Sequence, residues 1–242
     1  TDRLKLGLSL TPSHSKTRRL PTSIHNVIRQ SPWLPIYHTQ ETIDMFVDAD
    51  EFPDLRPGDY FYENHTKRID FNGDGSTGRP RTSGDANPFA QHTERQHYEY
   101  KTNMLSSAYL QYKIADGLTA KTSFGVTVEQ RKRTRYDGVM YHAAGASRAL
   151  YNLQNRFSTR LISDNTLDYN KVSGKHEFGA LAGFTVQQRQ TETSTVTGTG
   201  STNDLLRNLQ RAPSISDFEE INIVRRKVGL LAVRLGSRNR SG

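Results

Sequence analysis

Residues 70–75, DFNGDG, have the side chains and spacing with the clearest potential for cation chemistry. An EF-hand calcium loop begins D-x-[DN]-x-[DN]-G and ends with a bidentate Glu at its twelfth position. Four residues match the opening of that pattern: Asp70, Asn72, Asp74 and Gly75. The twelfth position is Arg81, a cation, and Asp, Asn and Gly also favour plain turns. We therefore expect a polar loop here, and cation binding by Asp70–Gly75 stays open.

A second group of potential metal ligands, His92, Glu94 and His97, lies in the segment HTERQH. On an extended strand His92 and Glu94 would share one face and His97 would lie on the other, so the three could not share an ion. The chain has no Cys, and the G-x-S-x-G, H-E-x-x-H and phosphate-loop motifs are absent. We therefore expect no enzymatic activity, no metal and no cofactor.

The net charge of +8 and the sequence pI of about 9.7 raise the possibility of a nucleic-acid partner. The basic residues, however, form four separate clusters: Lys16–Arg19, Arg131–Arg135, Arg225–Lys227 and Arg234–Arg240. No known nucleic-acid-binding motif accompanies them. We expect no nucleic-acid partner; the alternative, a basic nucleic-acid-associated protein, predicts binding that weakens steeply with added salt.

The elements that would position any site are strands, because apolar residues alternate with polar ones. In LKLGLSLT, leucine occupies every second position from Leu4 to Leu10, and LTAKTSFGVTVE alternates in the same way from Leu118 to Val128. A period of two places apolar side chains on one face of a strand. No run approaches the roughly 20 apolar residues of a membrane helix. A membrane barrel, whose strands alternate, remains possible.

The strand pattern predicts five strands, near 3–11, 104–114, 118–130, 159–170 and 176–188. Two of the connections are short and contain Gly, at 115–117 and 171–175, whereas long segments separate the hairpins. Short helices are expected within these long segments at 151–155 and 203–210. Alternating short and long connections are typical of membrane barrels. The predicted fold class is all-β: a fragment of a large antiparallel transmembrane β-barrel with long extracellular loops and short periplasmic turns. The alternative is a soluble β-sandwich, such as a carbohydrate-binding module.

A barrel strand would turn its apolar face to lipid and its polar face to a watery lumen. The polar face would include Lys113, Lys121, Glu129 and Asp168. Tyr112 and Tyr169 lie beside the short turns, where an aromatic girdle at the lipid–water boundary is expected.

Several segments resemble, in order, the barrel of SusC/RagA-type TonB-linked outer-membrane proteins. They are TDRLKLGLSLTPSHSKTRR, IHNVIRQSPWLPIY, NPFAQ, SSAYLQYKIADGLTAKTSFGV and NTLDYNKVSGKHEFGALAGFTVQ. The resemblance assigns residues 1–224 to part of the barrel of a TonB-dependent receptor. Residues 225–242, which begin RRKVGLLAVRLGS, do not alternate and form an atypical basic tail, expected to be truncated or outside the family pattern.

The resemblance implies TonB-dependent import of oligosaccharides or peptides through the outer membrane of a Gram-negative, Bacteroidota-type bacterium. The implied partners are a SusD-like surface lipoprotein, the TonB–ExbB–ExbD complex and outer-membrane lipid. The family contacts TonB through a plug region that this sequence does not contain. Six or fewer strands would also leave two open sheet edges in lipid, so this chain is a non-autonomous part of the transporter.

Trp33 and Tyr37, in the segment SPWLPIY, are the candidate substrate-binding residues. The residues before Pro32 and Pro35 are restricted to extended backbone. In one interpretation Trp33 and Tyr37 line the lumen and stack on sugar rings or peptide side chains. In the other, Trp33 and its neighbours anchor the long loop inside the mouth of the barrel.

Overall fold

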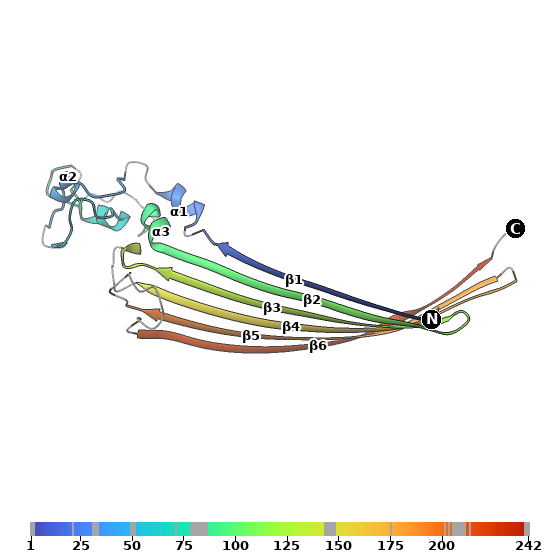
Figure 1. Cartoon of the computed structure of the whole chain (residues 1–242). Helices are drawn as coiled ribbons and strands as arrows, with labels where there is room; N and C mark the ends of the chain where they lie inside the picture. The colour runs from blue at the N-terminus through green and yellow to red at the C-terminus, as the bar shows by residue number, and fades with distance from the viewer. Residues whose placement is uncertain are drawn as a thin grey trace.

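The computed structural model describes residues 3–20, 22–30, 34–48, 52–70, 72–77, 87–142, 149–174, 176–200, 202, 204, 212 and 214–239. Most of these residues lie in six strands that form one antiparallel sheet in sequence order (Figure 1). The strands are β1 (Leu4–Arg18), β2 (Arg95–Ala115), β3 (Leu118–Asp137), β4 (Leu150–Ser173), β5 (His176–Thr199) and β6 (Ser214–Asn239). The described strands thus lie in a single sheet, whereas a β-sandwich requires two sheets packed face to face.

Short helices lie in the connections at one end of the sheet, far from the N terminus (Figure 1). The α-helices are α1 (Ile24–Arg29), α2 (Gln40–Asp44) and α3 (Pro88–Glu94), and the 3-10 helices are η2 (Glu63–Arg68) and η3 (Val139–Tyr141). Among the described residues, no helix is both long and apolar enough to cross a membrane.

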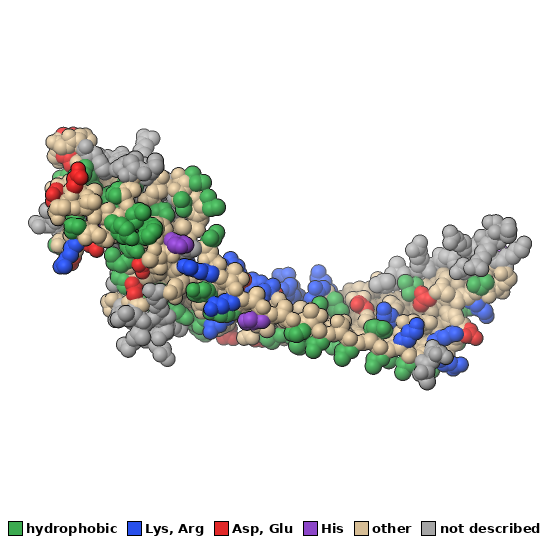
Figure 2. Space-filling view, turned by 45° about the horizontal axis from the view of Figure 1, so that its top comes forward, with side chains coloured by type: hydrophobic (Ala, Val, Ile, Leu, Met, Phe, Trp, Pro, Cys, Tyr) green, Lys and Arg blue, Asp and Glu red, His purple; other side chains and the backbone are tan. Residues whose placement is uncertain are grey.

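Cross-strand register divides the sheet into an apolar face and a polar face. On the apolar face, Leu6 of β1 pairs with Leu110 of β2, and Leu8 pairs with Ala108. Leu8 is 81% exposed, so nothing in the described chain covers this face. The opposite, polar face carries Lys113, Lys121, Glu129 and Asp168, as the alternation predicted. In Figure 2 Lys and Arg side chains follow one side of the long sheet and hydrophobic side chains follow the other.

The strands extend beyond the ranges that alternation predicted. On β3 the apolar positions end at Val128, yet the strand continues to Asp137. β1 likewise passes Leu10 and includes Pro12, whose missing N–H is tolerated on an edge strand. Beyond the apolar positions the strands still pair with their neighbours, although neither face of the sheet has to be apolar there. The alternation signal therefore fades before the strand does.

Two segments differ in type from the sequence-based expectation. Residues 151–155, expected to form a helix, belong to β4, and Tyr151 pairs with Tyr136 of β3. Hydrogen bonding to strands on both sides outweighs the weak local helix preference. Residues 225–239, expected to form an atypical tail, continue β6 and pair with β5, with one register shift between Leu181 and Gly183. The other expected helix, 203–210, lies outside the described residues except for Asp204.

The two short turns lie at the end of the sheet that also contains the N terminus (Figure 1). Gly117, in the turn between β2 and β3, has a φ of +83°, which only glycine adopts readily. A Cβ atom at this position would lie 2.3 Å from the Asn170 carbonyl oxygen. The backbone of Asn170 also donates a hydrogen bond to the Gly117 carbonyl at 2.7 Å, so the turn contacts the end of β4.

Candidate functional site

The connection between β1 and β2 has a buried core of its own. Phe61 and Ile69 are each 1% exposed, and they pack in the same unit as two buried histidines, His38 and His65. The His38 ring lies 4.6 Å from the Phe61 ring, centroid to centroid. Burial of this kind stabilises a segment in water without help from the sheet. The described part of the connection is therefore a small folded unit, which we call the loop unit: residues 34–48, 52–70, 72–77 and 87–94.

The two buried histidines form a hydrogen-bonded pair. His38 Nε2 lies 2.7 Å from His65 Nδ1, and His38 Nδ1 lies 3.0 Å from the Thr42 hydroxyl. One ring must donate and the other accept, so both rings cannot carry two protons without losing the bond. Burial lowers the pKa of each ring from 6.5 to about 4, more than the nearby Asp59 raises that of His38. The pair is therefore neutral at physiological pH.

Within the loop unit, Asn87 connects α3 to the segments around Ile36 and Phe61. Its Nδ2 donates to the carbonyl oxygens of Ile36 at 2.8 Å and Phe61 at 3.0 Å. Its Oδ1 accepts from the backbone N–H groups of Phe89 at 2.9 Å and Ala90 at 3.2 Å, which caps the helix. One buried amide thus joins α3 to two other segments of the loop unit, and α3 leads directly into β2.

A buried carboxylate ties the ends of β2 and β3 together below the loop unit. Asp137 accepts hydrogen bonds from Arg95 at 2.6 Å and from Arg135 at 2.5 Å. Burial alone would raise the pKa of Asp137, but the two guanidinium groups outweigh it and lower this pKa. Arg95 also stacks over the ring of Tyr141 in η3, 4.2 Å from its centroid. These ion pairs and the ring contact therefore join β2, β3 and η3 at the strand ends next to the loop unit.

Of the two predicted substrate-binding residues, the structure places Tyr37 and not Trp33, which lies outside the described residues. Tyr37 is 42% exposed and stacks on Tyr60, with ring centroids 5.4 Å apart. The edge of the Phe89 ring completes this group, 5.9 Å from Tyr37. Tyr37 therefore has one ring face against Tyr60 and is otherwise partly exposed to solvent. No local pattern in the sequence indicates Tyr60 or Phe89 as neighbours of Tyr37.

In the segment 70–75 the carboxylates bind their own backbone. Asp70 accepts hydrogen bonds from the N–H groups of Asn72, Gly73 and Gly75, at 3.0, 2.8 and 2.7 Å. These bonds, led by that from Gly75, lower the pKa of Asp70. Gly73 and Gly75 have positive φ. This is turn geometry, and the described residues contain no group of three or more His, Asp or Glu side chains arranged to hold a metal.

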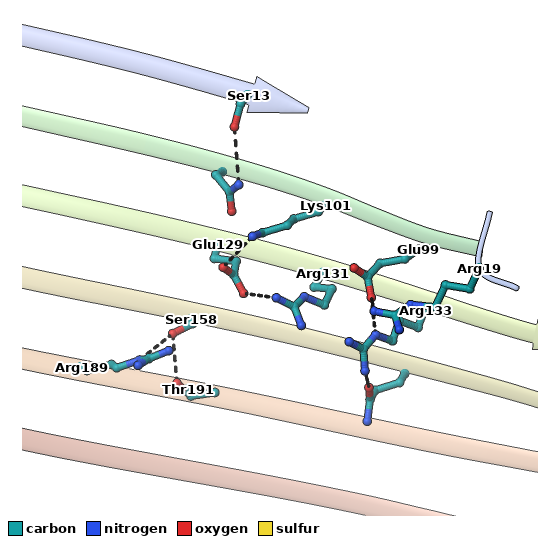
Figure 3. Close-up of polar contacts among 12 residues, drawn as sticks. Ser13, Arg19, Glu99, Lys101, Glu129, Arg131, Arg133, Ser158, Arg189 and Thr191 are labelled. Atoms are coloured by element: carbon teal, nitrogen blue, oxygen red, sulfur yellow. Dashed lines mark hydrogen bonds and ion pairs between the residues drawn. The ribbon is translucent and has the colours of Figure 1, made fainter. Parts of the chain in front are cut away.

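On the polar face, the β2–β3 half carries cations that are paired with carboxylates. Lys101 and Arg131 both contact Glu129, at 3.5 and 3.2 Å. Glu99 accepts from Arg133 at 2.5 Å and from Arg19 at 2.8 Å. Figure 3 shows these pairs side by side across neighbouring strands. Each carboxylate lies between two cations, so this half is an ordered network of ion pairs.

The β4–β6 half of the same face carries arginines without such partners. Arg160 pairs in register with Arg189, and Arg189 pairs with Arg225. Arg189 Nε donates to the Ser158 hydroxyl at 3.4 Å, and Ser158 lies 3.0 Å from the Thr191 hydroxyl (Figure 3). Sequence reasoning missed this group, because its members are distant in sequence and only cross-strand register brings them together.

Comparisons with known proteins agree with this arrangement. No protein-family model matches the sequence. The curated TonB-dependent receptor P3 of Formosa agariphila is 29% identical over 106 residues, which are 44% of this chain and 11% of that protein. Structures of the RagAB peptide importer in the closed-closed and open-open states align with TM-scores of 0.60 and 0.64, at 15% and 17% identity. They cover 95% and 99% of this chain and 24% of the importer chain.

This chain resembles part of the barrel of a TonB-dependent receptor. The predicted resemblance and the predicted all-β class are confirmed, and the sheet is a segment of a large antiparallel transmembrane barrel. The chain spans about a quarter or less of the proteins that it matches. The apolar face of the sheet is accordingly the lipid side of the barrel wall, and the polar face is the lumen side.

Proposed function

We propose that this chain is part of an outer-membrane transporter that imports oligosaccharides or peptides. In this proposal a SusD-like lipoprotein at the cell surface captures the substrate. The TonB–ExbB–ExbD complex of the inner membrane then drives uptake through the plug of the transporter. The protein is a transporter and not an enzyme, and its host is a Gram-negative, Bacteroidota-type bacterium.

The observation that carries this proposal is the division of one long sheet into an apolar and a charged face. The apolar positions on β3 run from Ala120 to Val128. At about 3.3 Å per residue and a tilt of about 40°, this length corresponds to a band roughly 20–25 Å tall. That height is close to the lipid-facing band of outer-membrane barrels. The charged face of the same strands supports a lumen through which a hydrated substrate passes.

The loop unit supports the proposed lipoprotein partner. It lies at the end of the sheet opposite the short turns (Figure 1), where the surface-facing loops of such barrels are found. Beside it, α1 exposes large apolar side chains, with Ile24 70% and Ile28 76% exposed. Apolar residues exposed at the mouth of a barrel suit contact with another protein. We therefore assign the lipoprotein to this end of the barrel.

A direct test uses the full-length gene in its host. We expect the protein in detergent-extracted outer-membrane fractions, and we expect uptake of a labelled oligosaccharide or peptide pool to fall when either this gene or tonB is deleted. A strain that lacks both genes should take up as much of the labelled pool as a strain that lacks tonB alone. Recovery of the full-length protein in the aqueous extract, or uptake that is independent of tonB, would overturn the proposal.

A further inference from the structure

Four arginines on β4, β5 and β6 form what we call the arginine cluster: Arg156, Arg160, Arg189 and Arg225. Arg160, Arg189 and Arg225 lie directly opposite one another on three neighbouring strands. Cβ atoms of directly opposite residues are about 4.5–5.5 Å apart, and like charges at that spacing destabilise a sheet. The cluster therefore costs folding free energy unless an anion offsets its charge.

No carboxylate of the described chain offsets the charge of the arginine cluster. Arg189 and Arg160 donate to neutral oxygens, those of Ser158 at 3.4 Å and Gln187 at 3.3 Å. Arg156 Nε is buried and has no hydrogen-bond partner. Throughout the described residues, the ion pairs of the polar face belong to β1–β3 and not to this cluster. A buried donor without a partner is costly, and here it marks the place of a missing acceptor.

The cluster surrounds a small hollow. Arg156, Arg189 and Arg225 line it together with Thr191 and Ile223, and its volume is about 130 Å³. A water molecule takes about 30 Å³ in the liquid, so the hollow has room for one oxyanion group and a few waters. Thr191 adds a hydroxyl and Ile223 an apolar wall. The shape and the lining thus suit a charged substituent of a larger molecule.

Guanidinium groups have the geometry to hold such a substituent. Their N–H donors form a planar fork that matches the oxygens of carboxylate, sulfate or phosphate. Several cations lining one cleft also raise the local concentration of anions and their rate of entry. The β2–β3 half of the face lacks this property, because Glu99 and Glu129 already occupy its arginines.

We propose that the arginine cluster binds oxyanion groups, carboxylate or sulfate, on the oligomer that the transporter imports. The protein then selects acidic oligomers over neutral ones of the same backbone. This inference rests on the proposed import function and defines the chemical class of its substrate. The register places the site on the polar face of the sheet, the lumen side of the wall.

The test compares two variants of the full-length protein with equal net charge. The first carries Arg156→Gln, Arg189→Gln and Arg225→Gln. The control carries Lys16→Gln, Lys132→Gln and Arg226→Gln, three positions that the register places on the opposite face. Arg226 is the direct neighbour of Arg225 on β6, so the control removes the same total charge from the same sheet.

Calorimetry on the detergent-purified proteins measures binding of four probes. Two are acidic, hexagalacturonate and hexaglutamate, and two are their neutral counterparts, the methyl ester and hexaglutamine. We expect at least one acidic probe to bind about tenfold or more tightly than its counterpart, and inorganic sulfate to compete with it. The cluster variant should lose this preference, since each guanidinium bond to a charged group is a strong one. The control should keep the preference within about twofold.

Three outcomes would overturn the inference: no preference for either acidic probe, an equal loss in both variants, or a preference that survives in the cluster variant. The acidic probe that binds identifies the backbone as glycan or peptide. The single variant Arg189→Lys, which keeps the charge but removes the fork, should give a partial loss even if the triple variant fails to assemble. If the full-length protein imports oligomers in a TonB-dependent way while the cluster variant keeps its preference for acidic probes, the proposed function stands and only this site is refuted.

Discussion

The loop unit and the sheet are stabilised in opposite ways. In the loop unit, large side chains such as Phe61 and Ile69 are almost fully buried, as in a water-soluble domain. In the sheet, Leu6 and Leu8 are 74% and 81% exposed, and the strands are held together by backbone hydrogen bonds in register. The difference shows that the loop unit contains its own core, whereas the sheet requires lipid to cover its apolar face.

The largest effect should come from removing the core of the loop unit. Phe61→Ala should lower the free energy of unfolding of this unit by about 3–5 kcal/mol, because a buried aromatic leaves a cavity. Hydrogen exchange of the full-length protein should show faster exchange in residues 34–70 and unchanged exchange in β3 and β4. Phe89→Ala is the control, since this ring is 44% exposed, and its effect should be smaller. Equal loss of protection in the sheet would contradict an independent core.

The sheet should instead respond to a charge on its lipid side. Leu8→Arg should cost about 2–4 kcal/mol of barrel stability, the usual effect of Arg near the middle of the bilayer. Its neighbour Ser9 faces the lumen side, so Ser9→Arg should have little effect. Heat-modifiability on gels measures the folded fraction of each variant. A Ser9→Arg defect as large as that of Leu8→Arg would reverse the assignment of the two faces.

Acid should weaken the loop unit before the sheet, through His38 and His65. Their folded-state pKa values, about 4, lie below the unfolded value of 6.5, so the unfolded chain binds more protons between these values. The contribution of the two neutral rings to the stability of the loop unit is therefore complete above about pH 6.5. It falls as pH decreases toward 4, by up to about 1.4 kcal/mol per pH unit for each ring. Limited proteolysis of the loop unit across this range measures the fall.

The matched control for this prediction is the exposed His92. The variant His92→Gln should keep the pH dependence, and His65→Gln should reduce it. If protease sensitivity is constant from pH 7 to pH 4, or if His92→Gln removes the dependence, the buried pair is not its source.

The smallest effect should appear at the turns. Gly117→Ala should destabilise the β2–β3 hairpin by about 1–2 kcal/mol, since a side chain is disfavoured at positive φ, and contact with the Asn170 carbonyl adds to this cost. Gly174 also has positive φ, but its Cβ atom would meet nothing within 4 Å, so Gly174→Ala should cost less. Thermal unfolding of the two variants in detergent gives the comparison. Equal shifts would mean that the close contact relaxes without cost.

The sequence predicts the parts of this fold that lipid constrains. Leu4–Leu10 alternate because one face must be apolar, and this alternation predicts the strand. His14 and Ser15 lie in the same strand above the apolar positions, where no solvent imposes a pattern. Residues 151–155 also lie beyond the apolar positions, so the local sequence predicts a helix there. The strand forms because these residues pair with β3 and β5, which are distant in sequence.

The residues of the candidate site likewise divide into those that a local pattern indicates and those that only folding brings together. Tyr37 could be proposed from its extended, proline-flanked segment, but its stacking partner Tyr60 is brought to it by folding of the loop unit. Arg156, Arg189 and Arg225 are scattered in the sequence among other basic residues. Only the register of β4–β6 shows that these three share a face and a hollow. Local patterns thus locate strands, whereas the site depends on how strands are aligned.

The strands continue well past the apolar positions, and this length has a consequence for access. From Val128 to Asp137, β3 adds roughly 30 Å of wall along its axis beyond the lipid boundary. The wall therefore extends beyond the lipid headgroups and places the mouth of the barrel in the surrounding medium. In the proposed transporter, a lipoprotein bound at this rim would not displace lipid, and substrate released there would enter a space already enclosed by the wall.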